Sequence, residues 1–134
     1  MEVLIDTNFI LTCVKQKIDL FLQLDELLGL YVAKVPEQVI SELKLLKDKK
    51  ELRINERESA KLALVLLKNK KIKVINSKKS NADSAIVEYA SVNKNNIFIA
   101  TLDKDLKNRI ISQTKSHLKV KFLTIRNKKR VIIL

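Results

Sequence analysis

Two acidic residues in this sequence follow short apolar runs at positions where they could do chemistry. Asp6 comes directly after residues 3–5, and Asp103 comes soon after the apolar residues that begin at Ile97. Such short runs are typical of buried strands in a parallel sheet, whose ligands bind outside the carboxyl ends of the strands. We therefore expect Asp6 and Asp103 to lie at one edge of a sheet and to belong to a site.

Two further acids lie on the apolar sides of expected helices. Because an α-helix advances ~100° per residue, Glu42 falls about 60° from Val39, on the side that also carries Leu43. The same construction places Asp83 beside Ile86 on a later helix. Glu42 and Asp83 should therefore point inward, toward the edge of the sheet where Asp6 and Asp103 are expected.

Carboxylates gathered in this way would repel one another. Two unit charges ~5 Å apart repel by ~3 kcal/mol at an effective dielectric constant of ~20. A divalent cation would relieve this repulsion, and oxygen ligands without His or Cys favour Mg²⁺ or Mn²⁺ over zinc. The open alternative is that a Lys or Arg side chain neutralises each acid separately. We expect Asp6, Glu42, Asp83 and Asp103 to be metal ligands and catalytic groups.

The composition limits the classes of protein that fit. A chain of 134 residues with 46% hydrophobic residues, one Gly and one Pro should form a single domain over residues 1–134. Lys and Arg number 27 against 15 acids, a net charge of +12. This charge favours a nucleic acid partner over a membrane, although a Lys-rich surface for solubility or heat stability is the alternative. Without a signal segment or a long apolar run, we expect a cytoplasmic protein.

Apolar periodicity predicts strands that alternate with helices. The expected strands cover residues 3–5, 30–35, 71–75, 97–101, 120–125 and 130–134, and the expected helices cover 9–14, 18–28, 36–50, 55–68, 82–92 and 103–111. This alternation predicts a three-layer α/β/α sandwich with a mostly parallel central sheet.

The helix expected over residues 55–68 carries two more specific predictions. Asn55 and Glu58 have the spacing of a capping box, which would begin the helix at Asn55. Leu62, Val65 and Leu66 are expected to face the core. His117, the only histidine, lies in a polar segment and is expected to be an exposed loop residue.

Several motifs together resemble the PIN-domain nucleases. They are Asp-Thr-Asn at residues 6–8, "VISELKLL" around Glu42, "ADSAIVEYA" around Asp83, and "IFIATLDKDLKNRI" around Asp103. The resemblance covers nearly the whole chain and implies a metal-dependent endonuclease of single-stranded RNA. It places Asp6, Glu42, Asp83 and Asp103 in the four acidic positions, and it gives supporting positions to Thr7, Asn8, Thr101 and the less constant acid Asp105.

The end of the chain, "KFLTIRNKKRVIIL", looks more like the branch that processes ribosomal RNA in archaea and eukaryotes than like the VapC toxins of the same fold. Residues 1–134 carry no cysteine-containing tail of the kind found in some eukaryotic members, so we expect no zinc role. Expected partners are single-stranded RNA, including precursor ribosomal RNA. An antitoxin is expected only for a toxin, and a homodimer is left open.

Cations near the motif segments are candidates for RNA binding, although each could be an ordinary solvated charge. The candidates are Lys44, Lys47, Lys104, Lys107, Arg109 and Arg126.

Other classes with an acid after the first strand fit less well. A haloacid-dehalogenase phosphatase would have a second Asp where Asn8 stands, and a receiver domain would have an acceptor Asp where Asn76 stands. A non-catalytic RNA-binding scaffold of the same fold would be expected to lose one or more of the four acids, and all four are present.

Overall fold

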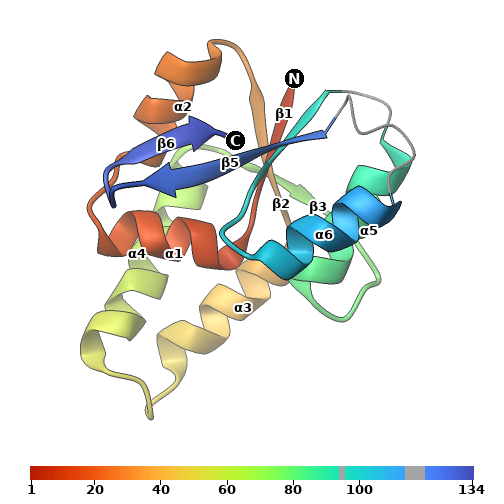
Figure 1. Ribbon diagram of the computed structural model, residues 1–134. Helices are drawn as coiled ribbons and strands as arrows, with labels where there is room; N and C mark the ends of the chain where they lie inside the picture. Colours follow the sequence, from red (N-terminus) through yellow and green to blue (C-terminus); the bar gives the residue numbers. More distant parts are fainter. Residues whose placement is uncertain (94–95, 114–119) are drawn as a thin grey trace.

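The structure is a computed structural model, and it describes residues 1–93, 96–113 and 120–134 (Figure 1). The strands are β1 (Glu2–Ile5), β2 (Val32–Pro36), β3 (Lys73–Ile75), β4 (Ile97–Ala100), β5 (Val120–Arg126) and β6 (Arg130–Ile133). The helices are α1 (Thr7–Lys15), α2 (Leu20–Leu28), α3 (Glu37–Asp48), α4 (Ile54–Asn69), α5 (Ala82–Val92) and α6 (Lys104–Gln113). Strands and helices thus alternate in the expected order.

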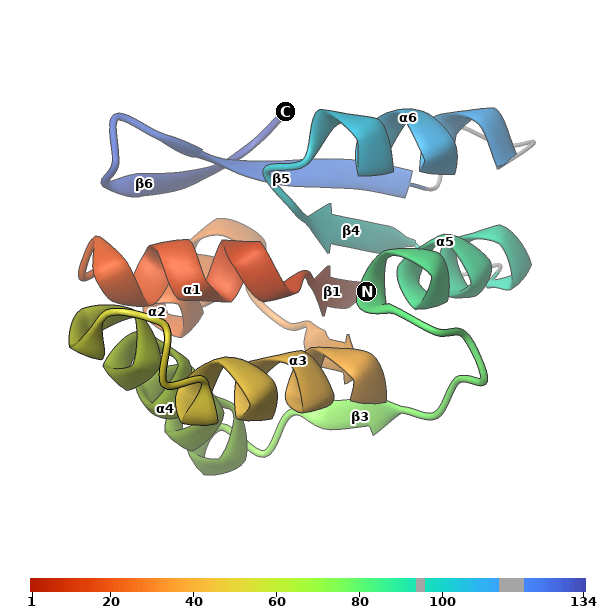
Figure 2. The ribbon, with the colours of Figure 1, turned by 90° about the horizontal axis from the view of Figure 1, so that it is seen from below.

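The strands form one six-stranded sheet in the order β3-β2-β1-β4-β5-β6. Every neighbouring pair is parallel except β5 and β6, which form an antiparallel hairpin. Apolar residues of α1 to α4 pack on one face of the sheet, and those of α5 and α6 pack on the other (Figure 2). The predicted three-layer α/β/α fold with a mostly parallel sheet is confirmed.

The two central strands, β1 and β4, set the position of the polar residues that follow them. All four residues of β1 and all four of β4 are buried. Helices cover both faces of the sheet, which explains why these strands show no alternation of apolar and polar residues. Ile5 pairs with Ala100, and the amide of Asp6 donates to the carbonyl of Ala100 at 3.0 Å. Both strands therefore end side by side at the same edge.

Helix α4 begins one residue earlier than expected, and the predicted capping box is wrong. The N-cap residue is Arg53, which makes no side-chain capping bond. Asn55 lies inside the helix, where its carbonyl accepts a hydrogen bond from the Ser59 hydroxyl at 2.8 Å. Asn55 therefore does not cap the helix, and the spacing of Asn55 and Glu58 alone is not enough to locate the helix start.

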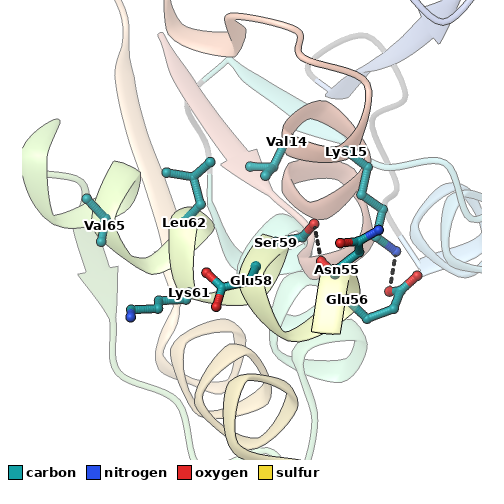
Figure 3. A pocket seen from close by; sticks show the side chains of 9 residues that line it. All are labelled: Val14, Lys15, Asn55, Glu56, Glu58, Ser59, Lys61, Leu62 and Val65. Atoms are coloured by element: carbon teal, nitrogen blue, oxygen red, sulfur yellow. Dashed lines mark hydrogen bonds and ion pairs between the residues drawn. The ribbon is translucent and has the colours of Figure 1, made fainter. Parts of the chain in front are cut away.

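The expected core face of α4 is also wrong for two of its three residues. Leu62 and Val65 are about half exposed and line a surface groove between α1 and α4 (Figure 3). The buried side of the helix consists instead of Ala60, Ala63 and Leu67. Two of these three buried residues are alanines, whose small apolar area gives a pattern based on large residues little to detect.

Within the described residues, no helix is both long enough and apolar enough to cross a membrane.

The free edge of β6 is partly covered by a side chain of α2. The Gln23 amide donates from Nε2 to the Lys129 carbonyl at 2.8 Å, and its Oε1 accepts from the Val131 amide at 2.7 Å. The Gln23 side chain thereby binds one main-chain acceptor and one main-chain donor that a neighbouring strand could otherwise bind. Unpaired edge groups otherwise invite pairing with another chain, so this contact both docks α2 and protects the hairpin.

Replacement of Gln23 by Ala should destabilise the protein by about 1–2 kcal/mol, since it removes two hydrogen bonds that each contribute about 0.5–1.5 kcal/mol net. The measurement is the urea midpoint of the variant against that of Glu26→Ala, which changes an exposed residue of the same helix. Equal midpoints for the two variants would show that Gln23 does not hold α2 against β6.

Candidate active site

Asp6 caps the first turn of α1 from the end of β1. Its Oδ1 accepts a hydrogen bond from the Thr7 amide at 2.8 Å, and its Oδ2 accepts one from the Thr101 hydroxyl at 3.0 Å. Only 3% of the residue is exposed. The parallel pairing of β1 with β4 brings Thr101 to this position, because both strands end at the same level. The Asp6 carboxylate is thus fixed by both central strands.

Glu42 reaches the same edge from α3. Its Oε1 accepts from the Thr7 hydroxyl at 2.9 Å, and its Oε2 accepts from the Ala82 amide at 3.0 Å. These two contacts join the first residue of α1 to the first residue of α5. Glu42 is therefore directed inward, as its helical position predicts. Its carboxylate links the N-termini of α1 and α5 by hydrogen bonds.

Asp103 and Asp83 complete the cluster from α6 and α5. Asp103 Oδ1 accepts from the amides of Asp105 at 2.9 Å and Leu106 at 3.2 Å, so it caps α6. The Asp103 amide donates to the Thr101 hydroxyl at 3.1 Å, which links Asp103 to Asp6 through one threonine. Asp83 lies in the first turn of α5. The structure thus brings the four predicted acids to one edge of the sheet.

The four carboxylates act on one another electrostatically. Burial raises the pKa of Asp6 to about 6, and the charges of Asp83 and Glu42 add to this rise while hydrogen bonds oppose it. Burial also raises the pKa of Asp83, with further contributions from Asp103 and Glu42, while Arg109 lowers it. These mutual effects show that the acids form one cluster of negative charge.

The described part of the chain does not show a separate Lys or Arg partner for each of the four acids. There, no Lys or Arg forms an ion pair with any of the four acids. Glu2, a buried acid elsewhere in the sheet, does pair with Lys34 at 3.0 Å. Among the described residues, a buried acid at the start of β1 is therefore ion-paired, whereas the acids at the carboxyl ends of the strands are not.

The supporting residues divide into two groups. Thr7 and Thr101 are buried and connect the acids, since Thr7 contacts Asp6 and Glu42 and Thr101 contacts Asp6 and Asp103. Asn8 and Asp105 are exposed. Among these four residues, the two threonines are therefore the ones that hold the cluster in place.

The donor set of the cluster suits a hard divalent cation, because it consists of carboxylate oxygens without His or Cys. Among the residues that the structure describes, no group of three or more His, Cys, Asp or Glu side chains is already arranged to hold a metal ion. The contacts explain this arrangement: oxygens of Asp6, Glu42 and Asp103 face protein donors, as expected for like charges without a cation between them. The residues present fit Mg²⁺ or Mn²⁺ by chemistry, and binding would draw the carboxylates together.

Among the six cations expected to bind RNA, Arg109 is the one that the structure links to the cluster. Its Nη2 donates to the Ser84 hydroxyl at 3.3 Å, next to Asp83. Lys47 lies near Asp48, 3.9 Å away. The remaining candidates are half-buried or exposed side chains, Lys44, Lys104, Lys107 and Arg126. His117 lies outside the described residues.

Sequence reasoning missed Gln38, which positions the segment before Asp83. Its Nε2 donates to the carbonyls of Ser77 at 3.0 Å and Lys79 at 2.8 Å, so it ties the connection between β3 and α5 to α3. Gln38 lies one helical turn before Glu42, and this spacing is the signal that could have placed it on the same inward face.

The fold and the cluster place the chain in a known class. It belongs to the PIN-like domain family, whose sequence model matches residues 3–128. Ribonuclease VapC4 of Methanocaldococcus jannaschii is 29% identical over 125 residues, which cover 92% of this chain and 89% of VapC4. The solved structure of the PIN domain endonuclease Utp24 is similar with a TM-score of 0.75 and 29% identity, over 98% of this chain and 90% of that one. The resemblance predicted from the motifs is confirmed.

Replacement of Asp6 by Asn should stabilise the metal-free protein at pH 8. The pKa of Asp6 is about 6 in the folded protein against an ordinary value of 3.8. Folding therefore carries no penalty below pH 3.8, where the carboxyl is protonated in both states, and the penalty is complete above pH 6. Two pKa units correspond to ~3 kcal/mol, of which the neutral amide should recover about 1–2 kcal/mol. The measurement is urea unfolding at pH 8 in chelator.

The control for this variant is Asp48→Asn, which changes an exposed aspartate whose loss should cost little. Mn²⁺ should then stabilise the wild-type protein more than Asp6→Asn, because a ligand stabilises only the state that binds it. A less stable Asp6→Asn protein in chelator, together with no effect of Mn²⁺ on the wild type, would contradict the metal-site assignment.

Proposed function

We propose that the protein is a Mg²⁺- or Mn²⁺-dependent endoribonuclease that cuts single-stranded RNA at the edge where β1 and β4 end. The observation that carries the proposal is the cluster of Asp6, Glu42, Asp83 and Asp103. Four separate elements supply these acids, and none forms an ion pair with a Lys or Arg of the described residues. Membership of the PIN-like domain family and the likeness to a ribonuclease and an endonuclease support the same conclusion.

In this proposal Asp6 and Asp103 hold the cation directly, and Asp83 adds a third carboxylate. A bound divalent ion supplies charge for a scissile phosphate and lowers the pKa of a water molecule. Glu42 keeps the N-termini of α1 and α5 together through Thr7 and Ala82, and it either joins the ligands or orients the attacking water.

The threonines and the helix ends give the acids fixed positions. The Thr101 hydroxyl donates to the Asp6 carboxylate and accepts from the backbone amide of Asp103, so it ties the Asp6 side chain to the main chain at Asp103. Asp6, Asp83 and Asp103 also lie at the N-termini of α1, α5 and α6, where the partial positive charge of a helix favours an anion. The chain thus keeps negative groups close together before a cation arrives.

The net charge of +12 supports a polyanionic substrate. The resemblance of the terminal segment, which forms the β5–β6 hairpin, to the branch that processes ribosomal RNA supports a role in ribosomal RNA maturation, and we propose that the protein acts in the cytoplasm. The likeness to VapC4 favours a second candidate, a toxin ribonuclease with an antitoxin partner. The genes beside this one distinguish the two, since a toxin is expected beside a small antitoxin gene. A non-catalytic RNA-binding scaffold is the third candidate.

Asp6→Asn should separate RNA binding from RNA cleavage. The amide has nearly the same shape as the carboxylate but lacks the charge that holds the ion, so cleavage should fall by at least a hundredfold. Binding without metal should be equal or slightly tighter, because one negative charge near the RNA backbone is removed. Both quantities are measured on one single-stranded RNA, with Mg²⁺, with Mn²⁺ and with chelator.

Glu88→Gln is the matched control, because Glu88 is an exposed acid on the same helix as Asp83. It should cleave like the wild type. Retained cleavage by a folded Asp6→Asn protein would remove Asp6 from the site. A wild-type protein that binds RNA and never cuts it would instead favour the scaffold.

A further inference from the structure

Arg109 lies where a basic side chain can meet both the acidic cluster and an approaching strand. It is on α6, which packs beside α5 on one face of the sheet (Figure 1). Its Nη2 donates to the Ser84 hydroxyl at 3.3 Å, and Ser84 follows Asp83 directly. This contact holds the guanidinium over the first turn of α5, at the rim of the cluster.

Arg109 acts electrostatically on Asp83 and still has hydrogen-bond donors for another ligand. Arg109 lowers the pKa of Asp83, but the described residues hold no ion pair between the two. A guanidinium has five N–H donors, and the bond to Ser84 takes one of them. Arg109 is also exposed. It therefore keeps donors that can bind a further anion from solvent.

A basic side chain at this place favours RNA binding, above all without metal, because the phosphates of the RNA must approach four carboxylates. At an effective dielectric constant of ~20, a phosphate ~7 Å from one carboxylate is repelled by ~2 kcal/mol. A guanidinium at the rim offsets part of this repulsion, and its planar fork matches two oxygens of one phosphate.

We propose that Arg109 binds a backbone phosphate next to the bond cut at the acidic cluster, and so sets the position of the RNA strand over Asp83. The inference rests on the proposed function and adds one substrate-binding residue to it. The rival explanation is that Arg109 only supports the fold by packing α6 against α5 and by balancing the charge of Asp83.

The two explanations differ in metal-free RNA binding. The experiment measures binding of one short single-stranded RNA to the wild type and to Arg109→Gln and Arg109→Lys by fluorescence anisotropy, in chelator and at several salt concentrations. Arg109→Gln should bind about tenfold more weakly at low salt, and the slope of log affinity against log salt should fall by ~0.7, the value for one phosphate contact of a single strand. Arg109→Lys should restore most of the slope. Lys61→Gln changes an exposed lysine of α4 that lines the groove between α1 and α4 (Figure 3); it is the charge-matched control and should keep the wild-type slope.

Mn²⁺ affinity gives the second measurement. Loss of a nearby positive charge should leave the affinity of Arg109→Gln for Mn²⁺ equal or higher at an unchanged melting temperature, whereas a role in packing α6 against α5 predicts a disturbed site with weaker Mn²⁺ binding and a lower melting temperature. Wild-type affinity and slope in Arg109→Gln would overturn this inference and leave the proposed function standing. A wild-type protein that does not bind RNA would overturn both.

Discussion

The burial of the Asp6 carboxylate between the ends of β1 and β4 is the constraint on which the rest of the site depends. A buried charge is costly unless it is hydrogen-bonded or paired, and here Thr7 and Thr101 supply the hydrogen bonds while no described cation supplies the pairing. Every other group of the site is arranged around this carboxylate: Thr7 extends the contact to Glu42, and Thr101 extends it to Asp103. The chain thereby stores unfavourable electrostatic energy at one edge of an otherwise well-packed sheet, which is typical of sites that bind a cation.

A second buried acid shows how the same sheet treats a structural charge. Glu2 lies at the opposite end of β1, where Lys34 pairs with it at 3.0 Å and the Tyr89 hydroxyl donates to it. Lys34 also donates to the Tyr89 hydroxyl at 2.9 Å. Such a closed network satisfies its charges internally and leaves little capacity for a ligand. The contrast between the two ends of β1 is physical support for a binding role at the carboxyl end.

The sequence was sufficient for those features that rest on strong local patterns. The apolar runs before Asp6 and Asp103 predicted two adjacent strand ends, and the 100° step of a helix predicted the inward direction of Glu42. Sequence patterns did not predict the features that depend on tertiary contacts. Gln38 and Gln23 act by reaching main-chain groups that are 39 and 106 residues away in sequence, and no local pattern encodes those distances. The buried face of α4 was missed because Ala60 and Ala63 contribute little apolar area, while the larger Leu62 and Val65 line the surface groove.

The claim that these carboxylates form a cation site is tested most directly by locating the ion. Crystals of the protein soaked in Mn²⁺ should show an anomalous scattering peak between the carboxylates of Asp6 and Asp103, with Asp83 turned toward it. Distances of ~2.1–2.3 Å to carboxylate oxygens would be those of a hard divalent cation. A peak at this position in the wild type and its loss in Asp6→Asn is the result that we predict. Well-ordered Mn²⁺ elsewhere on the protein, with Asp6, Glu42 and Asp103 keeping their present hydrogen bonds to hydroxyl and backbone amide groups, would contradict the account.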